Sequence, residues 1–440
     1  MNTNMNITQK FIKLANVNYT NNSNSDYTEI IHELEQEFEY DSNRNFFWSD
    51  PEQSLLYGTP IYKNSSESQK FTLNHLYWII QNNNTAASEI NGIMYNQVTH
   101  GVFENMGGLQ SLCKELCLET SQEHRHIHAF QRIGNKTRKA LLGKKKLANA
   151  SDIASKSSSL NFAYISPVLN STLKNASKLL LRKGEYCSSK YLKEVESKYD
   201  LNSVPNQGPA GRLASPALLN YFTLNWGSSP FLSCNYYVLR YIANALVKSQ
   251  EHPRSRYFKK KNNNNEFVPI PTAVSHFHFL DESYHTTTSL MIAQELYKAF
   301  SKPTVYEIFF SNFTIYLAQL NIIKFHSGLA YGLPARCFRD DMFYMNYIYN
   351  LLKSSLFGMT DKEAIFWMEK SFCYDHEGFH SASRFHRVWV NDLQNFFEDL
   401  DYLWPINRSM SLVDKQGLAS TGLEKSRQIF RDFSLSLTSN

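Results

Sequence analysis

The chain has 440 residues, which is enough for one large helical domain or for two or three smaller ones. Hydrophobic residues make up 42% and charged residues 19%, a balance typical of a globular protein with an ample core. The net charge of +5 is too mild to indicate a nucleic-acid-binding protein, and no motif that reads DNA or RNA is present.

Cysteine content and hydropathy bear on where the protein works. Six cysteines are too few for a disulfide framework, which favours a reducing compartment. Residues 1–13 lack the apolar segment of a signal peptide. The most apolar run, residues 308–323, contains Ser311, Asn312 and Gln319 and is too short and polar to span a bilayer. We therefore expect a soluble, cytoplasmic protein that does not contact membranes.

The N-terminal part of the chain predicts little regular structure at first. Residues 1–70 are rich in Asn, Ser and Thr and predict an irregular arm, with one short acidic helix near its middle. Helical periodicity begins at residue 73, and residues 73–82 predict a first helix. An Asn-rich break follows, and residues 86–104 predict a second helix that Gly107 and Gly108 end.

The middle of the chain alternates long helical patterns with polar tracts. Residues 109–133 predict a helix, and residues 134–160 predict a basic, Ser-rich excursion. Ser229-Pro230 is a strong helix start, with Ser as the N-cap and Pro at the first helical position. We expect that helix to end near Gln250 and to be followed by an irregular tract over residues 251–271.

The sequence pattern of the last third of the chain also predicts helices. Residues 272–300 predict a long helix that Lys302-Pro303 closes. Further helical patterns cover residues 305–326, 342–357, 360–371 and 381–397. Because strand alternation is nearly absent, the fold class is all-α, with a bundle over residues 71–300 and C-terminal helices over residues 301–440 packed on it.

The predicted helix at residues 272–300 carries three closely spaced side chains of the types that commonly bind metals. His278, Glu282 and His285 are spaced i, i+4 and i+7. At about 100° per residue, this spacing places all three on one stripe of the helix. Asp281 points about 100° away from that stripe, so we expect it to support a ligand or form a salt bridge rather than bind metal.

A second pair of such residues lies upstream. Glu123 and His126 share one face of the predicted helix over residues 109–133. Glu89 precedes them by about one helix, one turn and one helix. Two Glu-x-x-His helices and a helix with a lone Glu are typical of the di-metal core of a ferritin-like bundle. The alternative, buried polar groups without a metal, would require several charged side chains to lie in the core without a reason.

A single Glu-x-x-His pair carries little weight by itself. Glu377 and His380 form a third pair, preceded by His376. Nothing upstream completes a ligand set with these residues, so we interpret them as structural or surface groups.

The arrangement resembles the di-iron N-oxygenases that act on arylamines. Those enzymes use a lone Glu, a Glu-x-x-His, a second lone Glu and a His-x-x-x-Glu-x-x-His, and the resemblance covers roughly residues 70–300. The second lone Glu would lie on the predicted helix that starts at Pro230. No acidic residue occurs between Asp200 and Glu251, and Glu251 is the only near substitute. The chain therefore departs from the N-oxygenase pattern at the fourth carboxylate.

Loss of a carboxylate opens a coordination position that a halide can take. In this respect the chain resembles the dimetal-carboxylate halogenases of the cylindrocyclophane type. The resemblance implies dioxygen-dependent chlorination of an unactivated carbon in a medium-chain acyl group held by an acyl carrier protein. It also implies two iron ions, or one iron and one manganese ion, with dioxygen and chloride as co-substrates and an external electron donor. The implied catalytic and metal-binding residues are Glu89, Glu123, His126, His278, Glu282 and His285.

Two further expectations follow from the resemblance. The helix that lacks the acid would present small or neutral side chains to the halide, for which the candidates are Ser233, Cys234 and Asn235. An acidic carrier protein would dock on a basic patch, although such runs are also common as solvated faces. The basic residues form two runs, Lys136, Arg138, Lys139, Lys144, Lys145 and Lys146, and Arg254, Arg256, Lys259, Lys260 and Lys261.

Two other functions remain open at this point. An N-oxygenase or hydroxylase could use the same scaffold, and a non-enzymatic metal-binding bundle would need the same ligands. Halide in the product would distinguish the first alternative, and consumption of dioxygen would distinguish the second.

Overall fold

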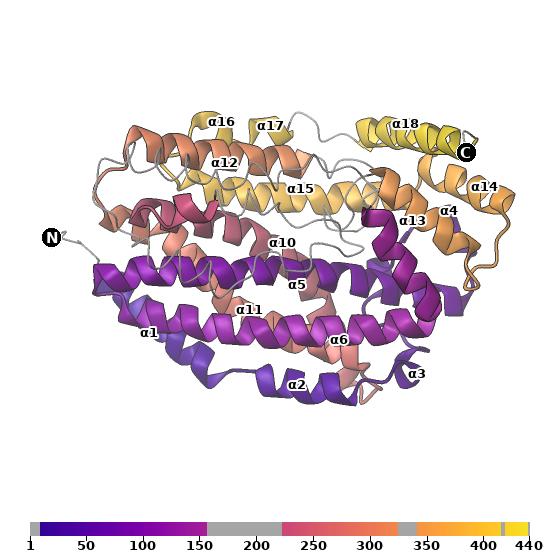
Figure 1. Cartoon of the computed structure of the whole chain (residues 1–440), viewed down its shortest axis with the longest axis horizontal. Helices are drawn as coiled ribbons and strands as arrows, with labels where there is room; N and C mark the ends of the chain where they lie inside the picture. The colour runs from indigo at the N-terminus through magenta and orange to yellow at the C-terminus, as the bar shows by residue number, and fades with distance from the viewer. Residues whose placement is uncertain (1–8, 156–221, 324–340, 415–418, 439–440) are drawn as a thin grey trace.

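The computed structural model describes residues 9–155, 222–323, 341–414 and 419–438, and every regular element in these ranges is a helix. The prediction of an all-α fold is confirmed. Four long helices form the central bundle: α5 (Glu67–Met106), α6 (Gln110–Ser155), α10 (Pro230–Asn263) and α11 (Ile270–Gln294). α5 packs on α6 and α10 packs on α11, and contacts of α5 with α10 and of α6 with α11 close the ring (Figure 1).

The described part of the expected irregular arm is largely helical. α1 (Gln9–Asn24) and α2 (Thr28–Glu37) pack along α6 and α11 (Figure 1). Phe11 and Ile31 are buried in these contacts, which gives both helices an apolar anchor. The short elements α3 (Tyr40–Asn43), η1 (Pro51–Gln53) and α4 (Pro60–Asn64) lead into α5.

The C-terminal part packs on two sides of the bundle. Its elements are η3 (Leu296–Ala299), α12 (Val305–Ile323), α13 (Asp341–Lys353), α14 (Asp361–Phe372), α15 (Glu377–Glu398), α16 (Pro405–Arg408), α17 (Ser411–Asp414) and α18 (Ala419–Thr438). α12 and α15 contact α10, whereas α13, α14 and α18 gather with α4 at one end of the molecule (Figure 1). Within the described ranges, no helix combines the length and apolar character needed to cross a membrane.

The helices α5 and α6 run further than their sequences predicted. The Asn-rich break expected after residue 82 does not occur, and Gln81 and Asn82 are instead buried within the helix. The guanidinium of Arg254 donates to the side-chain oxygens of both residues. α6 likewise continues into the segment expected to be an excursion and ends at Ser155.

α10 also extends past its predicted end, which changes the reading of Glu251. Ser229 caps the first turn through its side chain, as predicted. The helix then continues through Pro253, whose ring removes one backbone donor. In the turn before the proline, the side-chain amide of Gln53 donates to the carbonyl of Gln250 at 2.7 Å. Glu251 therefore lies inside α10 rather than beyond it.

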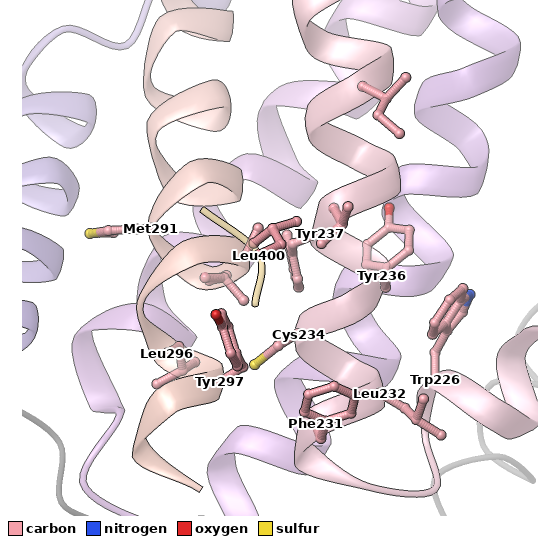
Figure 2. Packing of buried hydrophobic residues seen from close by; sticks show 14 of the residues in the cluster. Trp226, Phe231, Leu232, Cys234, Tyr236, Tyr237, Met291, Leu296, Tyr297 and Leu400 are labelled. Atoms are coloured by element: carbon pink, nitrogen blue, oxygen red, sulfur yellow. The ribbon is translucent and has the colours of Figure 1, made fainter. Parts of the chain in front are cut away.

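Apolar packing leaves one section of the bundle interior to polar side chains. One large cluster surrounds the start of α10 and the end of α11 and includes Trp226, Phe231 and Leu296 (Figure 2). Another apolar cluster fills the interior around Trp78 and Phe130. Many buried polar residues of these helices, Glu89, Glu123 and Glu282 among them, fall between the residues of these two clusters along α5, α6 and α11.

Candidate metal centre

This polar section holds all six predicted ligands. They are Glu89 from α5, Glu123 and His126 from α6, and His278, Glu282 and His285 from α11, and all are buried. Their ligand atoms form two groups in which every atom lies within 4.8 Å of the others. The first group is Glu89, His126, His278 and Glu282, and the second is Glu123, Glu282 and His285. Glu282 belongs to both groups, as a carboxylate that bridges two cations would.

The atoms converge on one carboxylate oxygen of Glu282. Its Oε1 lies 2.7 Å from Nδ1 of His285, 3.8 Å from Nε2 of His278 and 4.0 Å from Nδ1 of His126. Nε2 of His278 also lies 2.9 Å from Oε1 of Glu89. Each imidazole thus turns one nitrogen toward the carboxylates, which is the orientation that metal binding requires.

Glu251 lies behind His278. Its Oε1 is 2.8 Å from Nδ1 of His278, while Nε2 of the same ring faces Glu89. Glu251 is not part of either group of converging ligand atoms. The possibility that it replaces the missing fourth carboxylate is therefore not supported. Its contact instead fixes the proton on Nδ1 and leaves Nε2 free to bind a cation.

The other two imidazoles have the same kind of support. Nε2 of His126 lies 3.1 Å from Oδ2 of Asp281, and Nε2 of His285 lies 2.9 Å from Oε1 of Gln122. The sequence analysis anticipated the supporting position of Asp281 but missed Gln122. Its position four residues before His126, on the same stripe of α6, was the signal available. Acceptors behind all three rings are a feature of histidines that bind metals.

The charges in this section explain why a cation is needed. Burial and the nearby Glu123 raise the pKa of Glu89 to about 7. Burial and the neighbouring His278 oppose protonation of His126, but Asp281 and Glu123 raise its pKa to about 9. Without a metal, the carboxylates therefore draw protons onto the imidazoles, and a bound cation would displace those protons.

Three atoms of the cluster test whether the residues fit a metal. Oε2 of Glu89, Oε2 of Glu123 and Nδ1 of His126 are buried and have no hydrogen-bond partner among the described residues. Oε2 of Glu123 and Nδ1 of His126 lie 3.5 Å apart as an ion pair, and a bound cation would satisfy all three atoms. A donor set of carboxylate oxygens and imidazole nitrogens suits iron or manganese. The residues fit two such ions that share Glu282.

α10 faces this cluster with a cation. The guanidinium of Arg240 donates to Oε2 of Glu119 at 2.6 Å, to Oδ1 of Asn96 at 2.8 Å and to Oε1 of Glu123 at 3.2 Å. Sequence reasoning missed both Arg240 and Glu119. Glu119 lies one turn before Glu123 on the same face of α6, which was a usable signal, whereas nothing local marks Arg240.

The predicted halide-facing residues lie in the wrong part of α10. The hydroxyl of Ser233 donates to the carbonyls of Trp226 and Ser229, and the amide of Asn235 donates to the hydroxyl of Tyr402. Cys234 is buried in the apolar cluster (Figure 2). Residues further along α10, Arg240 and Glu251, flank the metal-binding residues instead of its first turns. Which turn of α10 lies at this level depends on how the helix packs against its neighbours, which the sequence does not show.

The third Glu-x-x-His pair is a surface feature, as predicted. Glu377 forms an exposed ion pair with Arg384, and His380 forms another with Asp375. Among the residues that the structure describes, neither side chain belongs to a group that could hold a metal.

An all-α bundle with a buried cluster of this composition defines the class of dimetal-carboxylate helical proteins. A family model described as "CylC-like: Acyl halogenase CylC-like" matches residues 10–434. The chain belongs to this family of acyl halogenases and is therefore an enzyme. No curated protein and no solved structure gave a significant match.

Proposed function

We propose that this enzyme uses dioxygen to chlorinate an unactivated carbon of a medium-chain acyl group carried by an acyl carrier protein. The observation that carries the proposal is the position of Glu282 in both groups of ligand atoms, within a chain of the acyl halogenase family. Two iron ions, or one iron and one manganese ion, would be held by the six clustered residues. When bound, the pair would supply the dioxygen chemistry that oxidises an aliphatic carbon, with electrons from an external donor.

The protein's own contribution is to hold and orient the ligands. Glu251, Asp281 and Gln122 fix which nitrogen of each imidazole faces the centre. Arg240 binds Oε1 of Glu123 and leaves its Oε2 for a metal. In the N-oxygenase pattern, this helix would carry the second lone Glu. In this chain, α10 presents the guanidinium of Arg240 to the cluster instead. The lower negative charge on this side favours an anion at the centre, which supports a role for a halide.

A cleft between α10, α11 and α15 would receive the acyl chain. It has a volume of about 620 Å³ and is lined by Tyr241, Phe279 and Phe396 among others. Its aromatic walls suit an aliphatic chain, and its lining includes Lys248, which lies close enough to Glu282 for their charges to interact.

The carrier protein would dock beside this cleft. His252 lines the cleft, and Arg256, Lys259 and Lys260 are exposed on the following turns of α10. An acidic partner would be attracted to this face. Arg254 of the same predicted run is buried and does not take part. In the other run, Lys136 pairs with Glu39, and the side chains of residues 144–146 lie outside the described residues.

The test is a halide exchange experiment on the full-length protein. The enzyme is loaded with iron, supplied with reductant and dioxygen, and given an acyl-carrier substrate in chloride or in bromide. We expect a chlorinated product in the first case and a brominated product in the second, both identified by isotope pattern in mass spectra. A hydroxylated product formed at equal rate with and without halide would contradict the proposal and indicate a hydroxylase.

A further inference from the structure

Lys248 is a half-buried cation in the floor of the cleft between α10, α11 and α15. Its Nζ donates to Oγ of Ser283 at 3.1 Å and lies 5.4 Å from the centre of the Phe279 ring. Within the described ranges, no carboxylate lies within ion-pair distance of this ammonium. By contrast, Lys136 pairs with Glu39 and Lys261 pairs with Glu266. A partly buried cation without an anion is costly, and such charges are usually paired.

The hydroxyl of Ser283 holds the ammonium in place without satisfying it. Its own hydrogen is donated to the carbonyl of Phe279 at 2.9 Å, so its oxygen accepts from Lys248. An ammonium has three N–H donors, and this contact uses one of them. The remaining donors are available to an anion that enters the cleft.

The surroundings select for a small anion of single charge. Burial lowers the pKa of Lys248, and the charges of Glu282 and Glu251 offset this lowering only in part. Asp392 lines the opposite wall of the cleft. These three carboxylates repel any anion, and they repel a phosphate or another multiply charged group more strongly than an ion of single charge. Larger acidic partners meet a separate cationic face at Arg256, about 12 Å further along the helix.

We propose that the ammonium of Lys248, positioned by the hydroxyl of Ser283, is a binding site for the halide ion outside the metal-binding cluster. This inference rests on the proposed halogenase function, because it assigns the site to the halide of that reaction. The site would raise the local concentration of halide beside Glu282.

The test measures chloride binding to the metal-free, full-length protein by the line width of the ³⁵Cl NMR signal. We expect saturable broadening that bromide reverses, and we expect Lys248→Met to lose it while Lys248→Arg keeps it. Lys70→Met is the matched control, since Lys70 is also half-exposed over an aromatic ring, that of Tyr62, and lies at the start of α5. If Lys248→Met fails to fold, Ser283→Ala should still weaken chloride binding several-fold. Saturable broadening that is unchanged in the Lys248 and Ser283 variants, or absent from the wild type, would overturn the inference.

The halide dependence of turnover separates this inference from the proposed function. We expect Lys248→Met to raise the KM for chloride at least about tenfold, with kcat at saturating chloride within about threefold of wild type. Chlorination with an unchanged KM for chloride would overturn the halide site and leave the halogenase function standing. Chloride binding that depends on Lys248, in a protein that never halogenates, would support an anion site and overturn the halogenase.

Discussion

The helices α6 and α11 differ from α10 in what they present to the centre of the bundle. α6 and α11 supply Glu-x-x-His pairs whose ligand atoms converge on Glu282. α10 supplies the guanidinium of Arg240 on one side of the cluster and Glu251 behind His278 on the other. With Glu89 of α5, these two helices supply the residues that would bind the cations, whereas α10 supplies groups that contact those residues from outside. This asymmetry is consistent with an enzyme that must also admit an anion.

The largest expected effect comes from the helices that carry ligands. Glu282→Ala removes the carboxylate shared by both groups, so both metal ions should be lost together. The rate of chlorination should fall more than about a hundredfold. This is more than the loss expected when a residue that only hydrogen-bonds to a metal ligand is removed. Metal content per chain and product formation are the measurements. Glu377→Ala, in the exposed pair of α15, is the control and should retain both metals. Retention of a full complement of metal by Glu282→Ala would refute the shared role.

The next largest effect tests the cation of α10. Arg240→Met leaves the buried Glu119 without its cationic partner, which should lower the free energy of unfolding by about 3–5 kcal/mol. Urea unfolding of the metal-free protein measures this. Arg384→Met breaks an exposed pair and should cost less than about 1 kcal/mol. If the free energy of unfolding fell by less than about 1 kcal/mol in both variants, Arg240 would not be needed to balance the charge of the interior.

The acceptors behind the histidines should give a smaller effect. Asp281→Asn keeps the shape of the side chain but weakens its hydrogen bond with Nε2 of His126, because the charge of the carboxylate is lost. Metal affinity or activity should drop by about 10–100-fold. Titration of the metal-free protein with Mn²⁺ measures the affinity, and Asp26→Asn on the surface serves as the control. An unchanged affinity would show that the orientation of His126 does not depend on Asp281.

The smallest effect is expected at the outer face of α10. Reversal of charge in Arg256→Glu with Lys259→Glu should lower kcat/KM for the carrier-bound substrate by roughly three- to tenfold, most strongly at low salt. The rate with a small acyl thioester should not change. Lys362→Glu with Lys370→Glu alters the same number of charges on α14 and should leave both rates intact. Equal losses for the two double variants would indicate a general charge effect rather than a docking face.

The sequence could predict the ligands because their spacing is local. His278, Glu282 and His285 share a stripe on any helix that covers them, and Glu123 and His126 share another. The partners on other helices could not be predicted in this way. The contacts of Arg240 with Glu123 and of Glu251 with His278 depend on how far α10 is shifted along its neighbours. Ser233, Cys234 and Asn235 were chosen only because they are small or neutral, which does not show which turn of α10 lies beside the cluster.

The helical content of the N-terminal segment was hidden for a related reason. α1 has few apolar residues, and its Asn18 and Asn22 would ordinarily indicate a loop. Both amides instead donate to Glu115 in the bundle interior, at 3.0 Å and 2.9 Å. A helix that packs through amide–carboxylate hydrogen bonds carries little of the apolar periodicity that sequence reading relies on.

Anomalous diffraction from crystals of the iron-loaded protein would test the central claim most directly. The account predicts two iron peaks, one beside Glu89, His126 and His278 and the other beside Glu123 and His285, with Glu282 between them. A single iron peak, or peaks at other residues in a protein that is active and fully loaded, would contradict it.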